Sequence, residues 1–532
     1  MDLLETQRPR TLLIVFCLLV WLPGLFALPP TDRDESRFAQ ASKQMIETGD
    51  YVRIMNGAEP RNRKPIGIYW LQVPFEAAAR AADLATQNPI WPYRLPSILG
   101  GLLAVLATFE LGQALVGRRA ALLAGGMLAA SIIVLAETHL AKTDAALLGA
   151  TTLAMGLLAR AYLRKQRLGW GPAALFWLAM GAGILLKGPI TPMVAGLTGI
   201  ALSLWDRRWR WLGRLRPGWG VLLMVLTVLP WFVAIGLATH GAFFREAIGG
   251  DLGNKLASGD DAHGAPPGLH LLLLPLLAFP SSFAVLYAIP TAWRARAEAG
   301  VRFLIAWVLP SWLVFEAVPT KLPHYTLPLY PAVALLAAWS VPAMKSGRRW
   351  VRVVRILPIV VAGVIGCSAL ALPIVLGLSP WRGVPVAVAA LIVGWLASRP
   401  DGQVAALAAM PLFALAFLGW GLPRAAPLWI APRVEAALAT AGVEGKVIGS
   451  VGFHEPSLMF LAGTGTIMEP TAATGAAALA SGQIAALLVD DRDMAAFGAE
   501  AGRLGIVPRA VSVMNGFNYS RGRWTALTLY LR

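Results

Sequence analysis

The sequence predicts an α-helical polytopic membrane protein with about thirteen transmembrane helices and a soluble α/β domain at the C-terminal end. Of its 532 residues, 57% are hydrophobic and only 14% are charged, whereas soluble domains carry about 25% charged residues. The mean hydropathy is +0.62. Apolar runs of roughly 20 residues, the length that crosses a bilayer, recur along the chain. Residues 430–532 lose this pattern and indicate a separate domain.

The first apolar run, Thr11–Leu28, follows Arg8 and Arg10 and ends before Pro29. It lacks a small-x-small cleavage pattern, so we expect an uncleaved first span rather than a signal peptide. Later spans are separated by short basic loops such as Arg207–Arg210, which are typical of the cytoplasmic side. With the N-terminus in the cytoplasm, an odd number of spans puts the C-terminal domain outside.

These patterns divide the chain into a transmembrane domain, residues 1–425, and an α/β domain, residues 430–532. The polar residues 30–92 form the first outer loop, in which we expect two helices lying in the membrane interface. In the C-terminal domain, Lys446–Val451, Gln483–Asp490 and Thr525–Leu531 predict strands. Glu435–Ala441 and Met494–Leu504 predict helices.

The formal net charge of +17 does not indicate nucleic acid, because Lys and Arg gather between the spans and form no basic face with stacking aromatic residues. Cys17 and Cys367 lie in apolar segments, and we interpret them as small hydrophobic residues. His139 and His263 also lack metal-ligand spacing. We therefore predict no metal ligand and no certain cofactor, although a divalent cation is left open.

Charged residues concentrate in the first outer loop, in Thr31–Phe38 and Arg61–Gln72. Taken singly, they are explained as solvated loop charges. Together they combine carboxylates, which act as general bases, with Arg and Lys, which hold phosphate. That combination suits a lipid-phosphate substrate that enters from the bilayer.

Further ionisable residues are expected at the same surface, in Glu137–Asp144, at Lys187 and in Lys321–Pro328. Ionisable residues at the membrane are expensive and commonly functional. Lys142 and Lys187 also admit the simpler explanation that lysine side chains at helix ends extend to the interface.

Four segments, in order, resemble motifs of the bacterial GT-C glycosyltransferases, the group with the lipid A aminoarabinose transferase and relatives of protein O-mannosyltransferases. Asp34–Phe38 resembles the Asp-Glu-x-Arg-aromatic motif, and Lys64–Trp70 resembles Lys-Pro-x-x-x-Tyr-Trp. Thr143-Asp144 resembles a second acidic site, and Lys321–Pro328 resembles Lys-Leu-Pro-x-Tyr-x-Leu-Pro. His454–Leu458 resembles a segment of the soluble domain of such enzymes.

The resemblance implies transfer of one sugar from a polyprenyl phosphate, with inversion, on the periplasmic face of the bacterial inner membrane. It implies that Asp34 is the general base, that Lys64 and Tyr325 bind the donor phosphate, and that Asp144 supports substrate positioning. The acceptor implied is lipid A or another envelope glycolipid. Our remaining site predictions are Glu35 as a catalytic residue, Arg61 and Arg63 at the donor phosphate, and Arg37, Tyr69, Lys321 and His324 in other substrate contacts.

The sequence departs from the aminoarabinose transferases before Lys64, where an aromatic and an acidic residue are replaced by Arg61 and Arg63. Two added cations would repel an amino sugar, so we expect an acidic sugar such as a uronic acid, or a different phosphate contact.

Three alternatives remain at this point. A protein hydroxyl is the acceptor in a protein O-glycosyltransferase that uses the same donor. A transporter or lipid flippase would also explain the spans, but paired half-repeats are not evident. A scaffold subunit of an envelope complex would leave the coexistence of Asp34, Lys64 and Asp144 unexplained.

Overall fold

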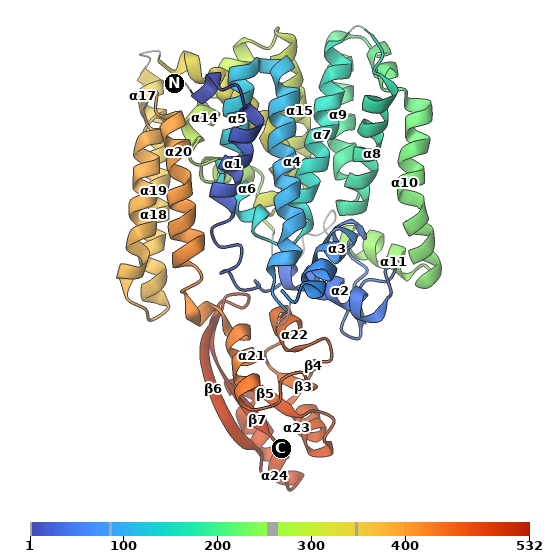
Figure 1. The fold of residues 1–532 in the computed structure, drawn as a ribbon, viewed down its shortest axis with the longest axis vertical. Helices are drawn as coiled ribbons and strands as arrows, with labels where there is room; N and C mark the ends of the chain where they lie inside the picture. The colour runs from blue at the N-terminus through green and yellow to red at the C-terminus, as the bar shows by residue number, and fades with distance from the viewer. Residues whose placement is uncertain (1–2, 85–87, 165, 253–263, 346–348, 400) are drawn as a thin grey trace.

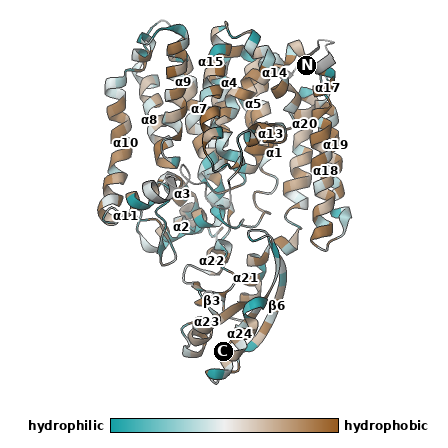
Figure 2. Cartoon of the chain, turned by 180° about the vertical axis from the view of Figure 1, so that it is seen from behind, coloured by the Kyte–Doolittle hydropathy of each residue, from teal (hydrophilic) through white to brown (hydrophobic). Residues whose placement is uncertain are grey.

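A bundle of apolar helices and a smaller sheet domain at one of its ends make up the chain (Figure 1). The computed structural model describes residues 3–84, 88–164, 166–252, 264–345, 349–399 and 401–532. The N-terminus lies at the opposite end of the bundle from the sheet domain (Figure 1). Hydrophobic residues dominate the long bundle helices in Figure 2, as expected of surfaces that face lipid.

Within the described residues, nine helices are long and apolar enough to cross a membrane. They are α4 (Trp91–Val116), α7 (Thr143–Leu163), α8 (Trp170–Lys187), α10 (Pro217–Ala238), α15 (Ala299–Ala317) and the segments Pro323–Met344, Val351–Val375, Pro380–Ala397 and Gln403–Gly421. The last four segments contain α16 (Tyr330–Ser340), α18 (Leu357–Val375), α19 (Val384–Ala397) and α20 (Gln403–Ala414).

Shorter or broken helices occupy the other predicted spans. A sixty-degree bend at Ser131 joins α5 (Arg118–Ala130) to α6 (Ile132–Thr138), and this pair would be a tenth span. Other helices of the bundle include α1 (Pro9–Trp21), α9 (Ile190–Asp206), α13 (Leu269–Leu277) and α14 (Ser282–Arg294). The chain is a multi-pass membrane protein, and about thirteen predicted spans are roughly consistent with this arrangement.

Helix α7 lies deep in the bundle, whereas α10 lies at its edge. In the most apolar stretch of 18 residues, 78% of the residues are buried inside the protein in α7, but only 11% in α10. A carboxylate in the first turn of α7 is therefore surrounded by protein, and it must find charged or hydrogen-bonding partners there.

The first outer loop folds onto the end of the bundle that faces the sheet domain (Figure 1). It contains α2 (Asp34–Thr48), a short hairpin of β1 (Met55–Asn56) and β2 (Glu59–Pro60), and α3 (Gly67–Ala81). Helix α2 ends at Gly49, which has the left-handed conformation that favours glycine (φ 72°). Helix α3 begins two residues beyond Pro65.

Helix α2 differs from the expected interfacial helix, because protein covers much of its polar side as well. It packs against α3 and against α22 (Pro456–Ala462) of the C-terminal domain. The Ser42 hydroxyl donates to Gln72 Oε1 (2.6 Å), and Lys43 Nζ donates to the Phe460 carbonyl (2.9 Å). These partners allow polar side chains to be buried.

The C-terminal domain is a five-stranded sheet in the order β4-β3-β5-β7-β6. The strands are β3 (Ile448–Val451), β4 (Ile467–Glu469), β5 (Ala486–Asp490), β6 (Arg509–Asn518) and β7 (Arg523–Leu531). β3 pairs in parallel with β4 and β5, and β7 pairs antiparallel with β5 and β6. Its helices are α21 (Ile430–Thr440), α22, α23 (Ala472–Ser481) and α24 (Met494–Arg503). The predicted α-helical membrane fold with a C-terminal α/β domain is confirmed.

Candidate functional site

A buried ion pair anchors the start of α2. Glu35 Oε1 lies 2.8 Å from Arg94 Nε, with both side chains at most 1% exposed. Glu35 also accepts hydrogen bonds from the Thr31 backbone (2.8 Å) and from the Ala141 backbone (2.9 Å). Burial opposes the charge of Glu35, but Arg94 and these donors outweigh it, so the pKa of Glu35 lies below its ordinary value.

Arg94 completes this anchor on its other side. Its guanidinium donates to the backbone carbonyls of Leu25 (3.3 Å), Leu28 (2.8 Å) and Pro29 (3.0 Å), where the chain leaves α1. Glu35 was predicted as a catalytic carboxylate. The structure gives it the surroundings of a residue that joins the first loop to α1, α4 and the α6–α7 turn.

Asp34 has the opposite environment, although it is the next residue. Its side chain is 57% exposed, and Oδ1 lies 3.6 Å from Arg61 Nη2. Its position in the first turn of α2 suits a carboxylate, because the helix dipole is positive there. An exposed carboxylate beside a cation remains accessible to a substrate.

Five ionisable side chains form a second, buried group, which we call the inner cluster. It consists of Glu137, Lys142, Asp144, Lys187 and His324. Lys142 Nζ lies 3.0 Å from Glu137 Oε1 and 3.6 Å from Asp144 Oδ2. Lys187 Nζ donates to Asp144 Oδ1, and His324 Nε2 lies 3.8 Å from the same oxygen.

The inner cluster and the first loop are close enough to interact electrostatically. The charge of Asp34 interacts through space with that of Lys142, and the charge of Lys64 interacts in the same way with His324. Lys187 Nζ lies 5.4 Å from the centroid of the Tyr325 ring. The structure thus brings the predicted Asp34, Lys64, Asp144, His324 and Tyr325 to one end of the bundle.

Other predicted site residues have different surroundings. Lys321 Nζ donates to the backbone carbonyls of Val318 (2.7 Å) and Ala265 (2.9 Å), so it stabilises a chain reversal rather than joining the inner cluster. Tyr69 is fully buried, beside Arg61 and against the ring of Phe38. Arg63 is exposed.

The C-terminal domain touches the residues immediately before Asp34. The Asp32 backbone N–H donates to the Tyr519 hydroxyl (2.6 Å), and the Arg33 guanidinium donates to the Ser520 carbonyl. Arg33 has a φ of 65°, which an L-residue with a long side chain adopts at a cost in energy. The β6–β7 turn therefore fixes the backbone that leads into Asp34.

Burial raises the pKa of Asp32 to about 7, and the nearby Glu455 adds to this effect. Glu455 itself accepts a hydrogen bond from Asn518 Nδ2 (3.0 Å). The contact between the first loop and the C-terminal domain thus includes buried polar groups as well as the exposed Arg33.

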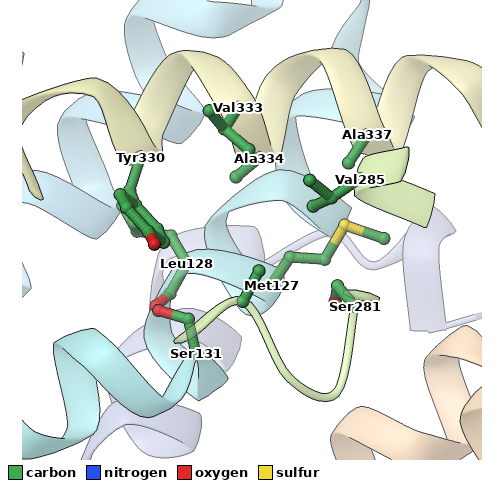
Figure 3. A pocket seen from close by; sticks show the side chains of 10 residues that line it. Met127, Leu128, Ser131, Ser281, Val285, Tyr330, Val333, Ala334 and Ala337 are labelled. Atoms are coloured by element: carbon green, nitrogen blue, oxygen red, sulfur yellow. The ribbon is translucent and has the colours of Figure 1, made fainter. Parts of the chain in front are cut away.

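A small cavity in the bundle, shown in Figure 3, is lined by apolar, serine and tyrosine side chains. Its lining includes Met127, Ser131 and Tyr330, and none of the predicted site residues. Among the described residues, no group of three His, Cys, Asp or Glu side chains is arranged to hold a metal. His263 lies outside the described residues.

Arg94 was not predicted from the sequence, and Glu137 was noted only as part of an ionisable segment. For Lys142 and Lys187, a functional role and the simpler extension to the interface were both left open. Arg94 stands three residues into α4 and is fully buried. The sequence did contain a signal for Arg94: it is a charged residue at the start of an apolar segment, and carboxylates occur elsewhere on the same side of the membrane.

The profile of the dolichyl-phosphate-mannose-protein mannosyltransferase family matches residues 13–241. An undecaprenyl phosphate-alpha-4-amino-4-deoxy-L-arabinose arabinosyl transferase of Pseudomonas aeruginosa strain LESB58 is 30% identical over 327 residues, 59% of this chain and 57% of the relative. The match thus spans little more than half of that relative. The transferase of the same name from Pectobacterium carotovorum is 27% identical over 446 residues, 78% of this chain and 76% of the relative.

Two solved structures share the fold. ArnT from Cupriavidus metallidurans, crystallised with undecaprenyl phosphate, superposes with a TM-score of 0.78 at 20% identity, covering 97% of both chains. The oligosaccharyltransferase AglB from Archaeoglobus fulgidus has a TM-score of 0.51 at 12% identity, covering 92% of this chain and 70% of AglB.

Proposed function

We propose that this member of the GT-C group, a relative of the aminoarabinose transferases, transfers a single sugar from a polyprenyl-phosphate donor to an envelope glycolipid such as lipid A. The names of the relatives from Pseudomonas and Pectobacterium support the reaction class. The fold shared with a protein crystallised with undecaprenyl phosphate supports the donor.

The proposed location is the bacterial inner membrane, with the site and the C-terminal domain on the periplasmic side. Basic residues between the spans support this orientation. The first loop and the C-terminal domain lie at the same end of the bundle (Figure 1), as a single periplasmic site requires.

The observation that carries the proposal is an accessible carboxylate, Asp34, within electrostatic range of the inner cluster. In the proposed step, the acceptor hydroxyl oxygen attacks the anomeric carbon, and its proton passes to Asp34. The bond between that carbon and the phosphate oxygen breaks, and the electron pair leaves with the polyprenyl phosphate. No nucleotide is consumed.

Negative charge grows on the leaving phosphate during this step. In the proposal, Lys64 and Lys187 stabilise it, and the Tyr325 hydroxyl donates to a phosphate oxygen. Cations that are fixed before the reaction lower the barrier, because they need not reorganise as the charge develops. Asp144 holds Lys187 through an ion pair. We therefore assign Asp144 and Glu35 positioning roles instead of contact with the reacting atoms.

Replacing Asp34 with asparagine tests the assignment of the base. Loss of a general base costs roughly 10²- to 10⁴-fold in rate, so we expect Asp34→Asn to reduce sugar transfer at least 100-fold while the protein folds. Asp50→Asn is the matched control, since Asp50 lies in the same loop and pairs with Arg53 (2.6 Å) away from the site. Transfer is measured by mass spectrometry of envelope lipids. Near-normal transfer by Asp34→Asn would exclude Asp34 as the base.

The match to the protein mannosyltransferase profile favours a second candidate, a protein hydroxyl as the acceptor. Cells that carry Asp34→Asn distinguish the two acceptors. Loss of a glycan from their envelope proteins, with unchanged glycolipids, would favour the protein acceptor. Movement of lipid in proteoliposomes without any covalent change would instead favour a flippase.

A further inference from the structure

We propose that His270 and Glu316 form a proton-dependent clamp that positions the turn carrying Tyr325, and that the imidazole must be protonated for full transfer. They are positioning residues, since they act on the reaction through this turn. This inference rests on the proposed function and deepens it. It concerns the strap, which we define as Gly264–His270, and the chain reversal after α15, which we define as Val318–Tyr325.

Backbone and side-chain hydrogen bonds hold the beginning of the strap against the chain reversal. Gly264 forms an antiparallel bridge with Thr320, and the Ala265 backbone N–H donates to the Pro319 carbonyl (3.3 Å). Lys321 Nζ donates to the Ala265 carbonyl (2.9 Å). Two segments that are distant in sequence are thus joined at the end of the bundle that carries the candidate site.

His270, at the other end of the strap, contacts the turn itself. Its Nε2 lies 3.1 Å from the Leu322 carbonyl oxygen, which also accepts the backbone N–H of Tyr325 (3.0 Å). The carbonyl that closes the turn before Tyr325 therefore also receives the imidazole. Because the Tyr325 hydroxyl is proposed to donate to the donor phosphate, the position of this turn bears on the reaction.

The surroundings of the two ring nitrogens determine where the protons must lie. A carbonyl oxygen only accepts hydrogen bonds, so Nε2 of His270 carries a proton. Nδ1 lies 3.6 Å from Glu316 Oε1, and both atoms are buried without a hydrogen-bond partner among the described residues. In a neutral ring, Nδ1 would be a bare acceptor that faces another acceptor. A second proton on the ring replaces this repulsion with a charge-assisted pair.

The surroundings of Glu316 favour its ionised form, so the added proton belongs on His270. Glu316 Oε2 accepts the backbone N–H of Gly268 (2.8 Å), immediately before α13 begins at Leu269. The helix dipole is positive there and favours a carboxylate. The His270 side chain is fully buried, and the edge of the Trp312 ring packs against it. Since a buried acceptor without a donor is costly, loss of the proton should loosen the strap.

Other charges do not take the place of this pair. Helix α18, which packs against α13, carries no charged residue. The other elements around His270 do carry charges, but these have partners of their own or lie at the far ends of their helices; they are Glu137, Arg294, Arg302, Lys321 and His324. His270 and Glu316 therefore share their proton with each other.

The first test measures kcat against pH for the full chain in detergent, with an undecaprenyl phosphate pentose donor and lipid A as the acceptor. The clamp is closed while His270 is protonated, so kcat should fall about fivefold from about pH 6 to about pH 9, a range that spans the titration of most histidines. The amide of His270→Gln can reach the Leu322 carbonyl but cannot bind a proton. This variant should show the lower kcat at both pH values, with little change in KM.

Glu316→Gln separates a proton-dependent clamp from a merely structural contact. Its amide can donate to the unprotonated Nδ1 and still accept the Gly268 N–H, so the clamp would close without a proton. We expect the fall in kcat to disappear in Glu316→Gln at the higher rate, whereas Glu316→Ala should be slow at both pH values. His240→Gln, at an exposed histidine beyond α10, is the control and should keep the original pH dependence. A fall in Glu316→Gln as large as in the unaltered protein would overturn the inference.

Nitrogen-15 NMR of the full chain, labelled at its histidines, tests the clamp without any transfer. The signal that His270→Gln removes should be that of an imidazolium at the lower pH and of a ring protonated at Nε2 alone at the higher pH. If no donor supported transfer, this titration would still support the clamp, and only the proposed function would be contradicted. A His270 ring that is neutral at the lower pH, or still charged at the higher pH, would overturn the clamp.

Discussion

Removing the side chain of Glu35 should destabilise the protein far more than neutralising Asp34. Glu35→Ala leaves Arg94 charged, buried and without its carboxylate. Breaking a buried ion pair by deleting one partner costs about 3–5 kcal/mol. The backbone donors of Thr31 and Ala141 would also lose their acceptor. We therefore expect the free energy of unfolding to fall by about 3–5 kcal/mol.

Asp34→Asn should change the free energy of unfolding by less than about 1 kcal/mol, because exposed ion pairs contribute only about 0–1 kcal/mol. Glu110→Ala is a second reference, since the Arg10–Glu110 pair is also exposed. Unfolding is followed by titration with a denaturing detergent, and sugar transfer is measured in parallel. Glu35→Gln keeps the shape of the side chain and should lose stability and transfer together. Unfolding of Glu35→Gln at the concentration that unfolds the original protein, with transfer lost, would show Glu35 to be catalytic and refute our reasoning.

Three further predictions concern the phosphate site and the domain contact. Lys187→Met should reduce transfer at least tenfold. Lys321→Met should lower the Tm but leave transfer unchanged at temperatures below that Tm. The reverse pattern would contradict the proposed phosphate contact. Tyr519→Phe removes the acceptor of the Asp32 N–H, so kcat should fall with little change in KM, and an unchanged kcat would show that the contact does not position Asp34. The raised pKa of Asp32, about 7 against an ordinary value of 3.8, means that the folded state holds a proton which the unfolded state releases. Its contribution to stability is present below pH 4 and is lost as pH rises to about 7; comparison of Tm against pH for Asp32→Asn, whose profile should be flatter over this range, tests this.

The fold was largely predictable because lipid imposes a simple pattern on sequence. Each long apolar run must satisfy its backbone hydrogen bonds as a helix. The strands β3 and β5 could be predicted because both are fully buried and therefore consist of short, nearly continuous apolar runs. β6 was not, because the residues at its start are mostly exposed and lack the regular alternation of a half-buried strand.

The candidate site was only partly predictable. Charge in the first loop marked Asp34 and Lys64, but sequence could not distinguish the environments of Asp34 and Glu35. That difference arises from Arg94, which is distant in sequence and contacts Glu35 only in the folded chain. Likewise, the pairing of Lys187 with Asp144 depends on how α7 and α8 pack.

The contact of Tyr519 and Ser520 with the residues before Asp34 has a consequence for biosynthesis. The first loop is translated long before the turn that holds its backbone, and in the proposed topology this turn has to reach the same side of the membrane before it can dock. A ribosome that stops before residue 519 would release a chain whose spans are complete but whose loop is unsupported. The order of synthesis would thus keep the site inactive until the β6–β7 turn has been made.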